Sequence, residues 1–142
     1  MRVSAAVMLF ALAGCGDSPE RVAGKFVDLY FVEIDQARAR PLTIGLARQK
    51  LDDELHLVET VRREYQAEQA KPSIFYKERS HALVGSEHAR VSYDLTVRHE
   101  QDVELKKQVM ISVEREGGAW RIANFVVSDG ESPAPPPSAP SR

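Results

Sequence analysis

The spacing of apolar residues changes once along this chain, near Pro72, and this change limits the possible folds. Before Pro72 the apolar residues recur every three or four positions, which is typical of amphipathic helices. From Ser73 onward they recur at every second position, which is typical of strands with one buried face. The order of the two patterns predicts an α+β fold, in which two N-terminal helices pack on a curved antiparallel meander of about four strands.

Both predicted helices have sequence signals at their ends. Ser18 as N-cap and Pro19 at the first helical position mark the start of the first helix, which we expect to reach about Ala37. Pro41 interrupts the pattern, and a second helix, with room for a short preliminary turn, is expected over about 42–69. The apolar stripe of this second helix consists of Ile44, Ala47, Leu51, Leu55, Val58, Val61 and Tyr65.

The strands are predicted to pair as hairpins, because the connections between them are short. These connections are 85–87, 99–102 and 117–118. The inward-facing residues of the two middle strands are expected to be Val91, Tyr93, Leu95, Val97, Val103, Leu105, Val109, Ile111 and Val113, with Lys107 as the one break.

The last strand, about 119–127, changes parity once. Its apolar residues fall into two sets, Trp120 with Ile122 and then Phe125 with Val127. Successive side chains of a regular strand point to opposite faces, so the two sets cannot both face inward without an extra residue between them. The sequence therefore predicts a β-bulge near Asn124.

The first fifteen residues have the three parts of a secretory signal. Arg2 supplies a positive charge, residues 3–13 are apolar and uncharged, and small residues precede Cys15, the chain's single cysteine. The segment Leu12-Ala13-Gly14-Cys15 resembles the lipobox of bacterial lipoproteins. The resemblance implies cleavage before Cys15, lipid attachment to Cys15, and a location on the extracytoplasmic side of the cell envelope, with inner and outer membrane both open because Gly16 follows the cysteine.

The remaining chain is expected to form one domain, residues 18–127, followed by a tail. Residues 128–142 hold five of the eight prolines and no apolar period, so we expect a disordered tail there. The formal net charge is −2 and no run of lysine or arginine is dense, so nucleic acid is not an expected partner.

The whole pattern resembles a known superfamily of cone-shaped domains. A Ser-Pro-Glu helix start, a second long helix and the ending Gly-Gly-Ala-Trp-Arg-Ile-Ala-Asn-Phe at 117–125 are similar to the nuclear transport factor two-like, ketosteroid isomerase and SnoaL-like proteins. The resemblance implies a cavity between helices and sheet. No strand is predicted between the two helices, where fuller members have one, and this indicates a reduced cone with a shallower pocket.

Few residues are candidates for chemistry. The four histidines, His56, His81, His88 and His99, have no metal-ligand spacing, and neither a metal nor a cofactor is expected. In enzymes of the superfamily a carboxylate base and a tyrosine line the cavity. Glu33 and Tyr30 are the candidates for these roles, because Glu33 falls inside the projected apolar arc of the first helix, where burial would raise its pKa. Asp94 is expected to point away from the cavity, opposite Tyr93.

Charges that interrupt the apolar faces allow a second interpretation. Glu33, Glu54 and Arg62 can lie at the cone mouth or pair with cations; Arg38, Arg40 and Arg62 are available for Glu33. The leading hypothesis is therefore a lipid-anchored, non-catalytic binding or accessory domain for an envelope protein or a small apolar ligand. The alternative is an isomerase- or dehydratase-like enzyme that uses Glu33 and Tyr30, and a passive structural lipoprotein is a third possibility. A side-chain-filled cone favours protein binding, whereas a buried Glu33 in a closed pocket favours an enzyme or a ligand binder.

Overall fold

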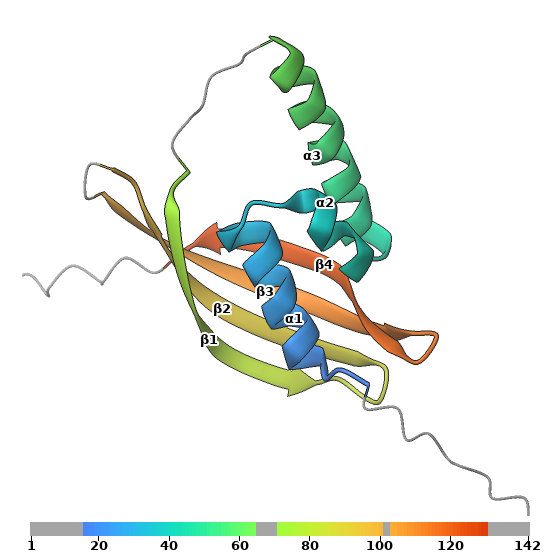
Figure 1. The fold of residues 1–142 in the computed structure, drawn as a ribbon. Helices are drawn as coiled ribbons and strands as arrows, with labels where there is room; N and C mark the ends of the chain where they lie inside the picture. The colour runs from blue at the N-terminus through green and yellow to red at the C-terminus, as the bar shows by residue number, and fades with distance from the viewer. Residues whose placement is uncertain (1–15, 65–70, 101–102, 131–142) are drawn as a thin grey trace, which may run out of the picture.

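The computed structural model describes residues 16–64, 71–100 and 103–130, and within them three helices lie on one side of a four-stranded antiparallel sheet (Figure 1). The elements follow in the order α1 (Pro19–Val27), a π-helical turn η1 (Asp28–Val32), α2 (Gln36–Ala39), a 3-10 turn η2 (Arg40–Leu42), α3 (Gly45–Glu64), β1 (Ser73–Leu83), β2 (His88–Arg98), β3 (Glu104–Glu116) and β4 (Ala119–Asp129). The predicted α+β class and meander are confirmed.

Helix α1 begins where the sequence predicts. The Ser18 hydroxyl oxygen accepts a hydrogen bond from the Arg21 backbone N–H at 3.2 Å, and Pro19 occupies the first turn. The buried face consists of Pro19, Val22, Ala23, Phe26 and Val27. The prediction of one helix reaching Ala37 is wrong, because the helix widens into the η1 turn and stops at Val32.

Helix α3 begins at Gly45, after the short preliminary turn for which the sequence left room. Pro41 lies inside η2, and the chain then passes through Thr43 before α3 begins at Gly45. Ala47 and Leu51 are fully buried, as the predicted stripe requires. Farther along, Val58 and Val61 are 37% and 46% exposed, so the second half of α3 leaves the body of the protein, as Figure 1 also shows. Tyr65 and the predicted end at Gln69 lie outside the described residues.

The sheet has the strand order β1-β2-β3-β4, with each neighbour antiparallel. The predicted bulge is present in β4: Asn124 pairs with Ser112 and Ile122 with Val113, so Ala123 is the extra residue. Because of it, Trp120, Ile122 and Phe125 are all buried although their spacing is irregular.

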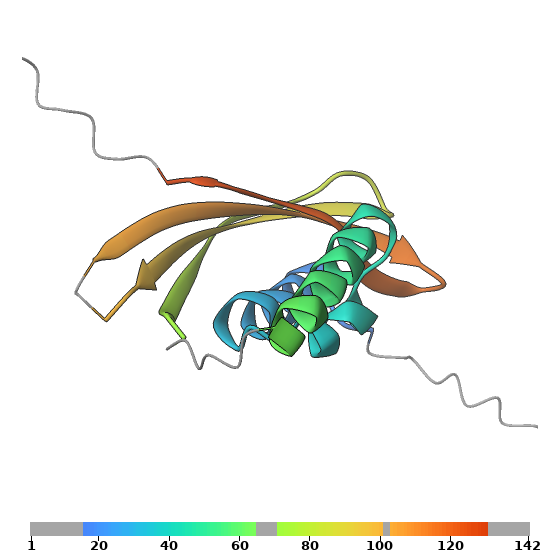
Figure 2. The same ribbon diagram turned by 90° about the horizontal axis from the view of Figure 1, so that it is seen from above.

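The core lies between the concave face of the sheet and helices α1 and α3 (Figure 2). The sheet contributes Ala89, Val91, Tyr93, Leu95, Val109, Ile111, Val113, Trp120, Ile122 and Phe125 to it. The predicted inward direction of Val91, Tyr93, Leu95, Trp120 and Ile122 is thus confirmed. The same face was expected to bury Val103, Leu105 and Val127. These residues are 50%, 43% and 45% exposed, since the sheet projects beyond the helices at that end.

The C-terminal boundary differs from the sequence prediction. Ser128 and Asp129 belong to β4 and pair with Gln108 and Lys107, although they were assigned to the tail. The Gly130 N–H also donates to the Lys106 carbonyl at 2.9 Å. The strand therefore continues by backbone pairing after its apolar pattern ends; the rest of the predicted tail, 131–142, lies outside the described residues.

No strand lies between α1 and α3 in the described part of the chain, as the sequence predicts. One residue takes its place: Thr43 forms an isolated parallel bridge with Ile122, and the Ile44 N–H donates to the Ile122 carbonyl at 2.9 Å. Thr43 is fully buried, and its hydroxyl donates to the Arg40 carbonyl at 2.6 Å. This bridge fixes the start of α3 against the bulged part of β4.

Candidate functional site

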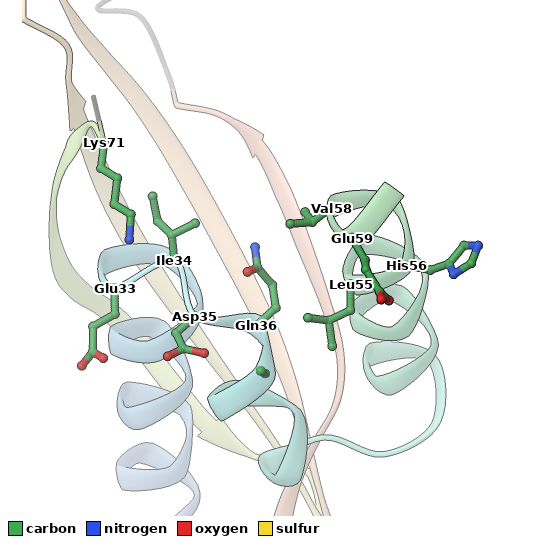
Figure 3. A pocket seen from close by; sticks show the side chains of 10 residues that line it. Glu33, Ile34, Asp35, Gln36, Leu55, His56, Val58, Glu59 and Lys71 are labelled. Atoms are coloured by element: carbon green, nitrogen blue, oxygen red, sulfur yellow. The ribbon is translucent and has the colours of Figure 1, made fainter. Parts of the chain in front are cut away.

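An open cleft of about 630 Å³ lies between the segment that follows η1 and the second half of α3 (Figure 3). Its lining residues are Glu33, Ile34, Asp35, Gln36, Ala37, Leu55, His56, Val58, Glu59 and Lys71. A cleft of this volume lies within the range of sites that bind small molecules.

The wall next to η1 depends on an unusual helix end. In η1 the Glu33 N–H donates to the Asp28 carbonyl at 2.8 Å, and the Asp35 N–H donates to the Leu29 carbonyl, also at 2.8 Å. Ile34, between these two donors, has a φ of 54°, a left-handed conformation that a β-branched residue rarely adopts. Glycine is usual at this position of a helix end, so Ile34 costs about 1–2 kcal/mol of backbone strain. Strained residues of this kind concentrate at functional sites.

The opposite wall is formed by α3, which contributes Leu55, His56, Val58 and Glu59. Leu55 and Val58 point from α3 into the cleft, whereas His56 points away from it (Figure 3). On the other side, Ile34 and Gln36 extend toward the same space, and Lys71 approaches from the residues before β1. The cleft therefore joins apolar side chains from two elements to polar groups at its rim.

Glu33 does not have the environment predicted from the sequence. Its side chain is 46% exposed and its Oε2 accepts a hydrogen bond from Arg38 Nη1 at 2.5 Å. The prediction of a desolvated Glu33 is wrong, because the projection assumed a regular α-helix and the wider η1 turn rotates the following residue off the apolar face. Of the candidate partners, Arg38 is the one used. Arg40 pairs with Asp52, and the side chain of Arg62 lies outside the described residues.

Tyr30 and Glu54 form the best-shielded polar contact between the helices. The partly buried Tyr30 hydroxyl donates to Glu54 Oε1 at 2.6 Å and links η1 to α3. Burial of the ring, together with the hydrogen bond to Glu54 and its negative charge, raises the pKa of Tyr30 above its ordinary value. The hydroxyl thus stays protonated and is already donated to a side chain of the protein itself.

Aromatic rings fill the space between η1 and the sheet. Phe26, Tyr30, Phe31 and Phe125 lie with centroids 4.7–6.4 Å apart, in stacked, tilted and edge-on pairs. Lys50 closes this cluster from α3: its Nζ donates to Asn124 Oδ1 at 3.0 Å and to the Phe125 carbonyl at 2.7 Å. At this level the cone interior is occupied by side chains.

The other candidate residues lie outside the cleft or at its edge. Asp94 is exposed on the outer face of the sheet, with its carboxylate 3.4 Å from Arg79, so its predicted direction is confirmed. All four histidines are exposed; His81 contacts Glu78 at 2.5 Å and His88 lies 3.6 Å from Glu114. Among the described residues no group of three acidic, histidine or cysteine side chains is arranged to hold a metal ion.

Sequence reasoning missed Ile34, Gln36 and Lys71 as cleft residues. They come from two segments separated by α3, and neither their type nor their spacing marks them as a site. Within the ranges that the structure describes, no helix has the length and apolar character needed to cross a membrane.

Comparison with known proteins supports the fold and goes no further. No family model matches the chain, and no curated protein matches it. Among solved structures, the chain is similar to a designed protein of the nuclear transport factor two-like type, with a TM-score of 0.51 and 12% identity over 77% of this chain and 95% of the other. The chain therefore has a nuclear transport factor two-like fold, which is found in both binding proteins and enzymes.

Proposed function

We propose that this protein is a lipid-anchored, extracytoplasmic binding domain whose cleft holds an apolar segment of a partner protein. The anchor is inferred from the Leu12-Ala13-Gly14-Cys15 segment and the leader before it. Two or three acyl chains at about 0.8 kcal/mol per buried methylene would hold the domain at the membrane almost irreversibly.

One observation carries the binding proposal: the apolar stripe of α3 continues beyond the core without a cover in the described structure. Leu55 and Val58 line the cleft, and Val61, one turn farther on, is 46% exposed. In a helix of a globular domain such a stripe normally packs against another element. An exposed continuation opposite the strained Ile34 is a suitable seat for an apolar helix or extended segment of another protein.

The packed interior supports a protein partner over a small enclosed ligand. The rings of Phe26, Tyr30 and Phe125 occupy the place where an enclosed cavity would lie. Between the described parts of η1, α2 and α3, the space that stays free is the open cleft. Open, partly polar clefts bury only part of a small ligand's surface, which limits its affinity.

The enzyme alternative has less support from the geometry. A general base in a desolvated site was the reason for choosing Glu33, and Glu33 is exposed and paired with Arg38. Tyr30, the proposed donor, is hydrogen-bonded to Glu54. A catalytic use of either residue would require both contacts to be exchanged for contacts with a substrate.

The test compares two charge insertions on neighbouring positions of α3. Val58→Arg places a cation in the cleft, whereas Leu57→Arg places it on a 63% exposed position that does not line the cleft. Each variant is purified from bacterial membranes in mild detergent, and co-purifying proteins and small molecules are identified by mass spectrometry. We expect a specific protein to be lost with Val58→Arg and retained with Leu57→Arg.

Two results would redirect the proposal. A lipid or metabolite lost only with Val58→Arg would replace the protein partner by a small apolar ligand. Equal co-purification with both variants would show that the cleft is not the binding site. The anchor is tested separately by Cys15→Ser, which should abolish labelling by a fatty-acid probe.

A further inference from the structure

The proposed anchor restricts how the domain can stand on the membrane. Three residues, 16–18, separate Cys15 from Pro19, the first residue of α1. An extended chain spans at most about 3.5 Å per residue, so the start of α1 stays within about 14 Å of the lipid-bearing residue. Whatever part of the fold surrounds the start of α1 therefore lies at the bilayer surface.

The tip of the β1–β2 hairpin occupies that place. The Glu20 carboxylate in the first turn of α1 lies 3.9 Å from the His81 ring near the end of β1, and Figure 1 shows the hairpin beside the start of α1. Beyond His81 come Leu83 and Val84, which are 65% and 55% exposed. They are the most exposed of the large apolar side chains at this end of the described structure.

The conformation of the tip presents these two side chains outward. The Val84 N–H donates to the His88 carbonyl at 2.8 Å, which closes the hairpin. Leu83 pairs with the buried Ala89, so its side chain shares the concave face, and at 65% exposure it is left uncovered there by the described residues. Apolar side chains at a tight hairpin tip gain free energy only if something removes them from water.

We propose that Leu83 and Val84 insert into the interfacial region of the bilayer that holds the Cys15 lipid, and that the cleft consequently opens away from the membrane. This proposal rests on the proposed lipid anchor. The polar loop Gly85-Ser86-Glu87 limits insertion to the boundary between headgroups and acyl chains. Basic and acidic side chains near the start of α1 are mixed, with Arg21 paired to Asp17, so anionic lipid is not required.

The position of the cleft follows from the length of the first helix. Residues 19–32 of α1 and η1 rise about 1.5 Å each, so the segment that lines the cleft begins about 20 Å from the start of α1. With the hairpin tip at the bilayer, the cleft faces a partner that arrives from the aqueous side of the envelope.

The experiment uses the acylated protein in phosphatidylcholine vesicles. The natural chain has one cysteine, and acylation blocks its thiol, so an introduced cysteine is the only site for a fluorophore. Val84→Cys reports on the hairpin tip. Val126→Cys is the matched control, because Val126 has almost the same exposure, 54%, and lies on the convex face of β4. Val58→Cys reports on the cleft.

We expect a quencher dissolved in the acyl chains to reduce the emission at Val84→Cys severalfold more than at Val126→Cys or Val58→Cys. Adding Leu83→Asn to Val84→Cys should weaken this quenching. Vesicle flotation and the mass of the N-terminal peptide measure the anchor independently. Protein that floats and carries lipid but shows equal quenching at the three positions overturns the hairpin proposal and leaves the anchor intact. Protein without lipid that does not float overturns both.

A contact between two copies of the hairpin gives a different signal. In that case the Val84→Cys emission would shift to the blue without quenching by the lipid-phase quencher, and the shift would disappear as the protein is diluted among vesicles. This result would also overturn the membrane proposal.

Discussion

Replacing Tyr30 by phenylalanine isolates the energy of the contact between η1 and α3. The change removes the hydroxyl that donates to Glu54 Oε1 at 2.6 Å and keeps the ring, whose centroid lies 4.9 Å from that of Phe125 and 5.2 Å from that of Phe26. Packing is therefore preserved, and the loss is that of one hydrogen bond to a partly buried carboxylate. Bonds to charged groups contribute about 1.5–3 kcal/mol.

This loss is large enough to measure by thermal unfolding. For a domain of this size 1 kcal/mol corresponds to about 4 °C in Tm, so Tyr30→Phe should lower Tm by about 6–12 °C. The fluorescence of Trp120, the single tryptophan, follows the transition. Glu54→Gln should cost less than Tyr30→Phe, because the amide oxygen still accepts the hydrogen bond.

A second tyrosine supplies the control. The Tyr76 hydroxyl donates to Asp28 Oδ1 at the same distance, 2.6 Å, but Tyr76 is 37% exposed. Water replaces an exposed hydrogen bond, so Tyr76→Phe should cost only about 0.5–1 kcal/mol. If Tyr30→Phe is no more destabilising than Tyr76→Phe, the contact between η1 and α3 stabilises the fold no more than an exposed hydrogen bond does.

Three further predictions follow from burial, exposure and protonation. Trp120→Ala should cost about 3–5 kcal/mol in urea unfolding, because Trp120 is 8% exposed and its ring also lies 5.3 Å from the Arg115 guanidinium; a loss below 1 kcal/mol would contradict the assigned face. Glu33→Gln should change the free energy of unfolding by less than about 1 kcal/mol, since the Glu33–Arg38 pair is exposed. A loss of about 3–5 kcal/mol would instead indicate that the pair is buried. Burial, the hydrogen bond to Asp28 and the charge of Asp28 raise the pKa of Tyr76 from 10.0 to about 12. The folded state therefore holds the Tyr76 proton more tightly than the unfolded state does. The resulting contribution to stability is complete below pH 10 and is lost as the pH rises toward 12. In a titration followed by phenolate absorbance, the step near pH 12 should be missing from Tyr76→Phe.

The sheet could be predicted in detail because strand faces are set by a short local period. The parity change between Ile122 and Phe125 was sufficient to predict the bulge, and Ala123 is the residue it inserts. The end of β4 was harder to predict, because Ser128 and Asp129 are held by backbone pairing to β3 and have no apolar pattern of their own.

The helix end and the cleft could not be predicted from local signals. No glycine lies between Gly24 and Gly45, so nothing in the sequence marks Ile34 as left-handed; the surrounding packing imposes that conformation. Lys71 lines the same cleft as residues 33–37 and α3, but it is brought next to them by the fold and not by its position in the sequence. A site assembled from separate segments with ordinary residue types leaves no spacing to recognise.

The wide turn η1 marks the place where this helix contains one residue more than a regular helical turn needs. A hydrogen bond from Glu33 to Asp28 encloses one residue more than a regular helical turn, so η1 is equivalent to a regular helix with one inserted residue. Deleting Val32 would remove this extra residue, so the Glu33 N–H could donate to the same Asp28 carbonyl in a regular helical turn and the later residues would keep their places. The wide turn is therefore the place in this wall of the cleft where the chain can lose one residue with the smallest change in shape.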